Sequence, residues 1–159
     1  MSRQPITREG YEKLQAQIKE KEDQKPAIQE RIKIAREEGD LKENAEYHAA
    51  REALSDLDRQ INTLRLKQQQ CEIVDKADLP TDEVGFGTRV TVKDLSDDME
   101  EIYELVGPGD EDFDGDILKI LSTSPLALAM LGKKVGEQFE AQIPAGVLKM
   151  EVISIEAAE

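Results

Sequence analysis

The chain has 159 residues, of which 38% are hydrophobic, 4% are aromatic and 35% are charged, and its formal net charge is −14. This composition leaves little material for a large core, so we expect part of the chain to be thin or elongated. No apolar run approaches the roughly 20 residues of a membrane span, the start MSRQPITREG lacks the apolar region of a signal peptide, and Cys71 is the single cysteine, so we expect a cytoplasmic protein.

Charge is distributed unevenly along the chain. Residues 1–75 carry 14 Lys and Arg against 16 Asp and Glu, a net charge of −2, whereas residues 76–159 carry 7 against 19, a net charge of −12. The first part is therefore the one able to present a basic patch to nucleic acid, while the second part repels phosphate.

Two segments of the first part repeat apolar residues in alternating steps of three and four, the pattern of a coiled coil. The two series are mirror images about residue 41, so an antiparallel hairpin that turns at Leu41 places every seam residue opposite another. We therefore expect an antiparallel coiled-coil hairpin over residues 1–75; the alternatives are two helices that pack elsewhere and one long helix that dimerises. The seam residues are Tyr11, Leu14, Ile18, Ile28, Ile32 and Ala35, then Tyr47, Ala50, Leu54, Leu57, Ile61, Leu64, Gln68 and Cys71.

Glycine and proline interrupt these helices. Gly39 argues against one unbroken helix, because glycine inside a helix costs about 1 kcal/mol relative to alanine and favours the position where helices stop. Pro26 removes a backbone donor and crowds the carbonyl of the preceding turn, so we expect a kink or bulge there. Lys21 and Lys25 occupy seam positions next to it, where their stems can cover apolar residues while the ammonium groups stay in water.

The turn itself is the stretch EEGDLKEN, residues 37–44, with an acidic tip at residues 40–43. Asp40 is a good N-cap and Glu43 stands three residues later, as in a capping box, so both acids can belong to the start of the second helix. Alternatively, the two carboxylates form half of a Mg²⁺ site, which phosphate or another protein's acids would complete. The two roles are compatible, because a carboxylate has two oxygens.

The pattern changes after residues 76–87, a stretch with Pro, Asp and Gly that predicts a linker. Alternating residues then predict strands at 88–94, 100–107, 115–122, 137–144 and 147–156, with a hairpin turn at Ala145 and Gly146. A Ser-Pro start and later glycines predict one short helix within 124–136. We therefore expect a small α+β domain over residues 88–159, with the acidic stretches 94–101 and 109–116 as solvated loops.

At the turn, AREEGDLKENAEYHAARE (residues 35–52) closely resembles the signature of the bacterial Gre transcript-cleavage factors, with the best fit to the GreA type. ITREGYEKL near the start and SPLALAMLGKKVGE in the second part are similar to two further stretches of that family. The resemblance spans nearly the whole chain, and it implies a transcription elongation factor whose C-terminal domain is FKBP-like, that is, similar to the FK506-binding proteins.

The resemblance implies that the hairpin enters the secondary channel of a backtracked RNA polymerase and stimulates the polymerase's own cleavage of the RNA 3′ end. Asp40 and Glu43 then correspond to the acids that help to hold a Mg²⁺ ion at the polymerase active centre. This ion is shared with the polymerase and is not tightly bound by the free protein. The chain is therefore expected to be a monomer without turnover of its own, with RNA polymerase and the backtracked RNA as partners.

By the same resemblance, Arg36, Lys42 and Arg51 are candidate RNA contacts, although each can equally be ordinary solvated helix surface. We interpret Tyr47 and Cys71 as packing residues. In the C-terminal domain, the matching segment makes three residues, Ser124, Pro125 and Leu126, candidates for docking on the polymerase rim; the alternative is a plain helix start. Leu128 departs from the family, whose members often have a basic residue there, which affects how the rim is bound.

Two other functions compete with this one. The first is a secondary-channel modulator or inhibitor without cleavage activity, which the presence of Asp40 and Glu43 disfavours. The second is an autonomous peptidyl-prolyl isomerase built on the C-terminal domain. Such a pocket needs an aromatic lining, and the domain offers few aromatic residues for it, namely Phe86, Tyr103, Phe113 and Phe139.

Overall fold

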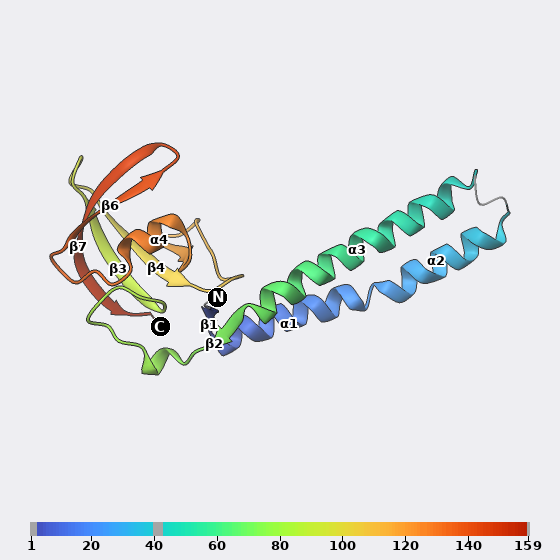
Figure 1. Cartoon of the computed structure of the whole chain (residues 1–159), viewed down its shortest axis with the longest axis horizontal. Coiled ribbons are helices and arrows are strands. Elements are labelled where there is room, and N and C mark those ends of the chain that lie inside the picture. The colour runs from blue at the N-terminus through green and yellow to red at the C-terminus, as the bar shows by residue number, and fades with distance from the viewer. Residues whose placement is uncertain (1–2, 40–42, 159) are drawn as a thin grey trace. The chain divides into compact units, whose positions relative to one another are not determined.

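The structure is a computed structural model that describes residues 3–39 and 43–158 (Figure 1). The chain divides into two compact units: Glu12–Gln70 forms one, and Met1–Tyr11 together with Cys71–Glu159 forms the other. The first unit is helical and the second is built on a sheet, so the predicted α+β class is confirmed.

The helical unit is the predicted antiparallel hairpin. Helices α1 (Arg8–Glu22) and α2 (Lys25–Glu37) follow each other along one side, and α3 (Ala45–Gln69) returns along the other (Figure 1). The seam residues meet as expected in the middle of the hairpin, where Ile18 and Ile61 are each only 2% exposed. The core there is thin, because it consists of a few aliphatic layers between two helices, and its buried members are Leu14, Ile18, Leu57 and Ile61.

At Pro26, where a kink or bulge was predicted, the structure has a break between α1 and α2. The first helix ends at Glu22, and Pro26 is the second residue of the next helix, where a missing backbone N–H breaks no helical hydrogen bond. The neighbouring seam lysines reach polar groups of α3. Lys25 Nζ lies 2.6 Å from Asp58 Oδ1, and Lys21 Nζ donates a hydrogen bond of 2.9 Å to the side chain of Gln60.

The second unit contains a five-stranded sheet in the order β5-β4-β3-β7-β6, in which only β4 and β5 are parallel. The short helix α4 (Pro125–Met130) packs on it, with Ala127 and Met130 fully buried. All five strands and the helix match the predicted elements to within two residues at each strand end. The strands are β3 (Thr88–Asp94), β4 (Glu100–Val106), β5 (Ile117–Leu121), β6 (Gln138–Ile143) and β7 (Gly146–Ala157).

A further pair of strands was not predicted. Strand β1 (Gln4–Ile6) runs parallel to β2 (Cys71–Ile73), with Cys71 in register with Gln4, and Cys71 is buried. Three residues are too few for an alternating pattern to be recognised. The structure therefore groups the first 11 residues with the sheet unit, whereas the sequence assigned residues 1–75 to the hairpin.

The stretch expected to be a linker, residues 76–87, is partly integrated into the sheet unit. It contains a single turn of 3-10 helix, Lys76–Asp78, and then Val84, which is 1% exposed and belongs to the main core. Both backbone groups of Val84 are bonded to the segment after α4: its N–H to the carbonyl of Lys133 at 2.8 Å, and its carbonyl to the N–H of Gly132 at 2.9 Å. An apolar side chain between Pro80 and Gly85 thus anchors this segment. Across the described residues, no helix combines the length and apolar character needed to cross a membrane.

Candidate functional site at the hairpin turn

The turn of the hairpin lies between the last residue of α2, Glu37, and the first residue of α3, Ala45. Gly39 follows the C-cap with a φ of 133°, a left-handed value that suits glycine, which fits its predicted role as a helix stop. Asp40 and Lys42, the candidate metal ligand and the candidate RNA contact, lie outside the described residues. The second candidate ligand, Glu43, is described and exposed.

The second helix is capped by Asn44, so the predicted capping box at Asp40 and Glu43 is wrong. The side-chain oxygen of Asn44 accepts a hydrogen bond of 3.0 Å from the N–H of Tyr47, and its amide nitrogen donates to the carbonyl oxygen of Ala35 at 2.5 Å. An asparagine offers an acceptor and a donor on one side chain, which a carboxylate at Asp40 does not. Glu43 therefore precedes the cap, and within the described residues no hydrogen bond or ion pair occupies its carboxylate.

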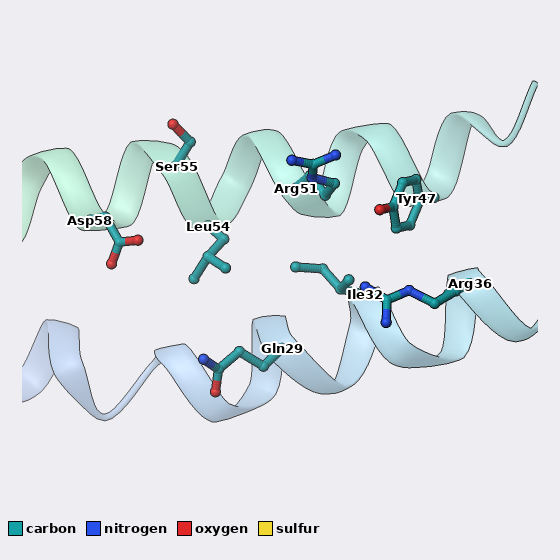
Figure 2. A pocket seen from close by; sticks show the side chains of 8 residues that line it. All are labelled: Gln29, Ile32, Arg36, Tyr47, Arg51, Leu54, Ser55 and Asp58. Atoms are coloured by element: carbon teal, nitrogen blue, oxygen red, sulfur yellow. The ribbon is translucent and has the colours of Figure 1, made fainter. Parts of the chain in front are cut away.

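Two of the predicted RNA contacts come together one turn below. Arg36 on α2 and Arg51 on α3 both direct their guanidinium groups at the ring of Tyr47, with the Cζ atoms 6.0 and 5.7 Å from the ring centroid (Figure 2). The ring itself is 8% exposed, which confirms Tyr47 as a packing residue. His48 meets the same ring edge-on, with centroids 5.6 Å apart.

These side chains stand at one end of a groove between α2 and α3 (Figure 2). Its volume is about 700 Å³, and it is open to solvent along the hairpin. The floor is formed by the partly buried seam residues Ile32 and Leu54, and Gln29 and Ser55 add polar groups to its walls. Residues 29 and 55 were not predicted as part of a site, because single polar residues on a helix surface carry no pattern.

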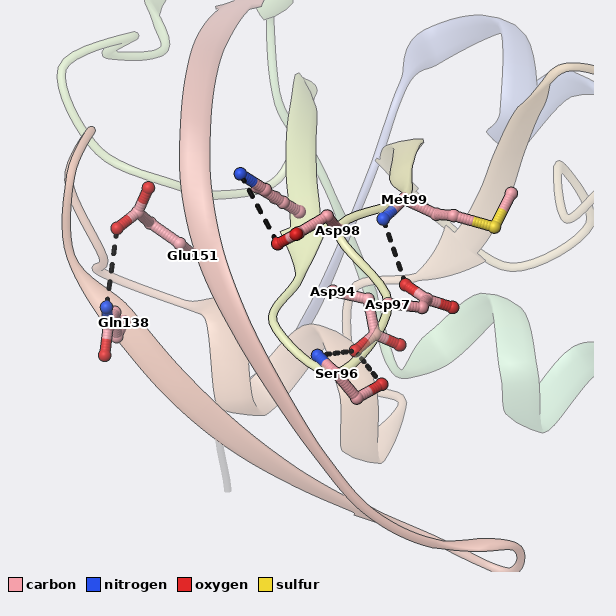
Figure 3. Close-up of polar contacts among 8 residues, drawn as sticks. Asp94, Ser96, Asp97, Asp98, Met99, Gln138 and Glu151 are labelled. Atoms are coloured by element: carbon pink, nitrogen blue, oxygen red, sulfur yellow. Dashed lines mark hydrogen bonds and ion pairs between the residues drawn. The ribbon is translucent and has the colours of Figure 1, made fainter.

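In the described part of the chain, no three His, Cys, Asp or Glu side chains come together as a metal-binding group. In the acidic loop after β3, the carboxylates are used by the loop itself (Figure 3). Asp94 accepts from the hydroxyl of Ser96 at 2.7 Å and from its N–H at 2.9 Å, and Asp97 accepts from the N–H of Met99 at 3.0 Å. The two hydrogen bonds from Ser96 hold the pKa of Asp94 below its ordinary value of 3.8.

The predicted docking residues lie at the start of α4. Ser124 is its N-cap, and its hydroxyl oxygen accepts a hydrogen bond of 3.3 Å from the N–H of Ala127. Together with Pro125 and Leu126, it lines a concave, almost wholly apolar pocket of about 340 Å³. Phe113, which is 67% exposed, also lines this pocket. The sequence analysis named Phe113 only as one of the few aromatic residues of the domain, and its place beside Ser124 was not predicted, because it stands alone in an acidic stretch.

Comparison with known proteins decides the family. A family model described as "Transcription elongation factor, N-terminal" matches residues 4–73, and one described as "Transcription elongation factor, GreA/GreB, C-term" matches residues 79–157. The chain belongs to the Gre family of transcription elongation factors.

Relatives within the Gre family match over nearly the whole chain. Transcription elongation factor GreA of Helicobacter hepaticus is 39% identical over 98% of this chain and 94% of its own length, and GreA of Thermodesulfovibrio yellowstonii is 41% identical over 95% of each. Among solved structures, the GreA factor homolog 1 (Gfh1) of Thermus thermophilus aligns over 98% of this chain and 99% of its own, with 21% identity and a TM-score of 0.44. Gre factors work with RNA polymerase, so the hairpin turn and the α4 pocket are candidate surfaces for contact with the polymerase.

Proposed function

We propose that this chain enters the secondary channel of RNA polymerase and stimulates the polymerase's own cleavage of backtracked RNA, with Asp40 and Glu43 as metal-binding carboxylates. The observation that carries the proposal is the exposed carboxylate of Glu43 at the turn. Asn44 performs the capping of α3, and among residues 3–39 and 43–158 no hydrogen bond or ion pair occupies the Glu43 carboxylate. In a Gre-family chain, this acid and Asp40, three residues earlier in the sequence, fit half of a shared metal site.

The hairpin is suited to delivering these acids into a narrow channel. Helix α3 has 25 residues, which corresponds to about 38 Å at 1.5 Å per residue. Two helices packed on a thin apolar seam form a slender unit, whereas a compact domain of the same size would be too wide. Ion pairs between the helices, such as Arg65 Nη2 with Glu22 Oε1 at 3.1 Å, help to keep the two helices in register.

Each group at the turn then has a distinct task. Asp40 and Glu43 would help to hold a Mg²⁺ ion at the polymerase active centre, where the ion would lower the pKa of the attacking water and neutralise charge on the scissile phosphate. Glu43 and Asp40 offer oxygen ligands of the kind that this ion prefers. Arg36 and Arg51, together with Lys42, bind phosphates of the extruded RNA without reading its sequence. The chain has no turnover of its own in this scheme, and it acts as a monomer in the cytoplasm.

The C-terminal domain holds the factor on the polymerase in this proposal. The apolar pocket formed by Phe113 and residues Ser124 to Leu126 accepts an apolar side chain of the polymerase rim. The net charge of −12 on residues 76–159 favours a basic surround for that side chain and keeps the domain away from nucleic acid. Phe113 is the one aromatic residue among those that line this pocket, which supports docking over proline isomerisation.

The test is RNA cleavage in a purified bacterial polymerase complex stalled in the backtracked state with Mg²⁺. Asp40→Asn and Glu43→Gln are each expected to lower the maximal cleavage rate by about 100-fold or more while leaving competition for the polymerase unchanged. The matched control is Glu52→Gln, which removes an exposed carboxylate of α3 away from the turn. Cleavage that survives both tip substitutions would exclude the metal role. Binding without any cleavage by the unmodified protein would instead identify a modulator or inhibitor.

A further inference from the structure

Tyr47 contacts cations from both helices of the hairpin. The guanidinium group of Arg36 reaches its ring from α2, and that of Arg51 reaches it from the next turn of α3, at 6.0 and 5.7 Å from the centroid (Figure 2). Both distances are within the range at which a cation is attracted to an aromatic face. A tyrosine needed only to fill the seam would not have to meet two arginines.

Three other arginines of the hairpin form ion pairs with carboxylates. Arg31 pairs with Glu46 at 3.3 Å, Arg59 with Asp56 at 2.9 Å, and Arg65 with a glutamate of α1. Within the described residues, Arg36 and Arg51 have no such ion pair, although both are exposed. An arginine that rests on a ring has its N–H donors available for another anion, whereas an arginine in an ion pair already donates to a carboxylate.

The position of the ring is fixed from the backbone. The N–H of Tyr47 is the group that the Asn44 side chain caps, at 3.0 Å, so the first turn of α3 sets where the ring lies. Tyr47 is 8% exposed, and its side chain points from α3 toward α2 (Figure 2). Tyr47 can therefore orient two side chains that would otherwise move freely in solvent, and the groove beside it leaves room for a bound chain.

We propose that Tyr47 is a positioning residue, which holds Arg36 and Arg51 at the end of the groove so that both bind phosphate groups of single-stranded RNA. The proposal rests on the proposed function, since it concerns the RNA that the hairpin meets in the polymerase. Two arginines already restrained by a ring lose less conformational freedom when they bind phosphate, so the gain is in affinity for RNA rather than in the chemical step.

The experiment uses the full chain in the cleavage reaction, with the protein concentration varied at a fixed Mg²⁺ concentration. Tyr47→Leu keeps an apolar side chain in the seam and removes the ring. It is expected to raise the half-maximal concentration about tenfold at an unchanged maximal rate. The affinity of Tyr47→Leu is also expected to depend less steeply on salt. The magnitude of the slope of log affinity against log salt concentration should fall by about 0.7 for each phosphate group that the variant no longer binds. Tyr47→Phe keeps the ring and is expected to behave as the unmodified protein. Tyr11→Leu, a tyrosine substitution at the start of α1, is the control.

A mutant cycle separates positioning from stability. In the double variant Arg36→Gln/Arg51→Gln, adding Tyr47→Leu is expected to have no further effect on the half-maximal concentration. An equal additional loss in that background, or a loss with Tyr47→Phe as large as that with Tyr47→Leu, would overturn the proposal. A fall in the maximal rate of Tyr47→Leu at an unchanged half-maximal concentration would also overturn it. If the unmodified protein causes no cleavage, the proposed function fails, and the same variants are compared by competition for the backtracked complex.

Discussion

The side chain of Asn44 bonds the two helices of the hairpin together, because its amide nitrogen donates to the carbonyl oxygen of Ala35, 2.5 Å away, while its oxygen caps α3. Ala35 is 1% exposed and its carbonyl also accepts from the N–H of Glu38 at 3.2 Å. The Asn44 side chain thus bonds a carbonyl group near the end of α2 and an N–H group in the first turn of α3. The position of Glu43, the residue before it, depends on this bond.

Asn44→Ala is therefore expected to loosen the turn. Loss of the cap costs about 1 kcal/mol and loss of the bond to Ala35 about as much again. Asn44→Asp keeps an acceptor for the N–H of Tyr47 and loses only the donor, so its effect should be about half as large. The measurement is hydrogen exchange of the amides of residues 45–47 in the full chain. Equal protection in Asn44→Ala and in the unmodified protein would show that the turn is held by something else.

The sequence predicted the hairpin because its seam is long and strictly periodic, and it predicted the five strands because each alternates over five or more residues. It did not predict the cap. Asp40 and Asn44 are both good N-cap residues, and only the bond to Ala35, across the turn, favours the asparagine. Local patterns contain no information about a partner nine residues away. For the same reason the parallel pair β1 and β2 was missed, since its two members lie about 67 residues apart in sequence.

The thin seam makes the hairpin sensitive to single substitutions. Ile61 is 2% exposed and packs with Ile18 and Leu57, so Ile61→Ala is expected to cost about 2–5 kcal/mol of unfolding free energy. Leu66→Ala on the same helix is the matched control, because Leu66 is 58% exposed and should change stability by less than about 0.5 kcal/mol. Thermal unfolding followed by circular dichroism at 222 nm reports on both. Similar melting temperatures for the two variants would contradict a core at this layer.

The sheet unit contains a shielded ion pair between neighbouring strands. Arg89 Nη2 lies 3.1 Å from Glu104 Oε1, and Glu104 is 4% exposed. Arg89→Met leaves this carboxylate buried without its partner and is expected to cost about 3–5 kcal/mol. The double substitution Arg89→Met/Glu104→Leu removes the charge as well, so it should recover most of that loss. Calorimetric unfolding of both variants measures the difference, and a double variant as unstable as the single one would contradict the explanation.

The hydrogen bonds from Ser96 lower the pKa of Asp94, and the stability of the acidic loop therefore depends on pH. The folded-state pKa lies below the unfolded value, so the loop's stabilisation is present above the unfolded value and is lost as the pH falls through the folded one. Ser96→Ala removes the larger of the two bonds, and the pKa of Asp94 should then rise toward 3.8. Carboxyl chemical shifts in an NMR titration measure it directly. An unchanged midpoint in Ser96→Ala would assign the shift to the backbone N–H instead.

In the proposed function, docking through the α4 pocket is a separate task from the chemistry of the turn, and a substitution can test it alone. Phe113 is 67% exposed, so Phe113→Asp should fold normally while placing a charge in an apolar wall. Burial of one large apolar side chain contributes about 1.5–3 kcal/mol, so the half-maximal concentration for RNA cleavage should rise at least about tenfold at an unchanged maximal rate. Val147→Asp is the control, since Val147 is 55% exposed and does not line the pocket. Equal effects of the two substitutions would show that added negative charge, and not the loss of an apolar contact in the pocket, weakens binding. An effect confined to Phe113→Asp would place the polymerase contact at this pocket, because only there does the new carboxylate meet an apolar partner.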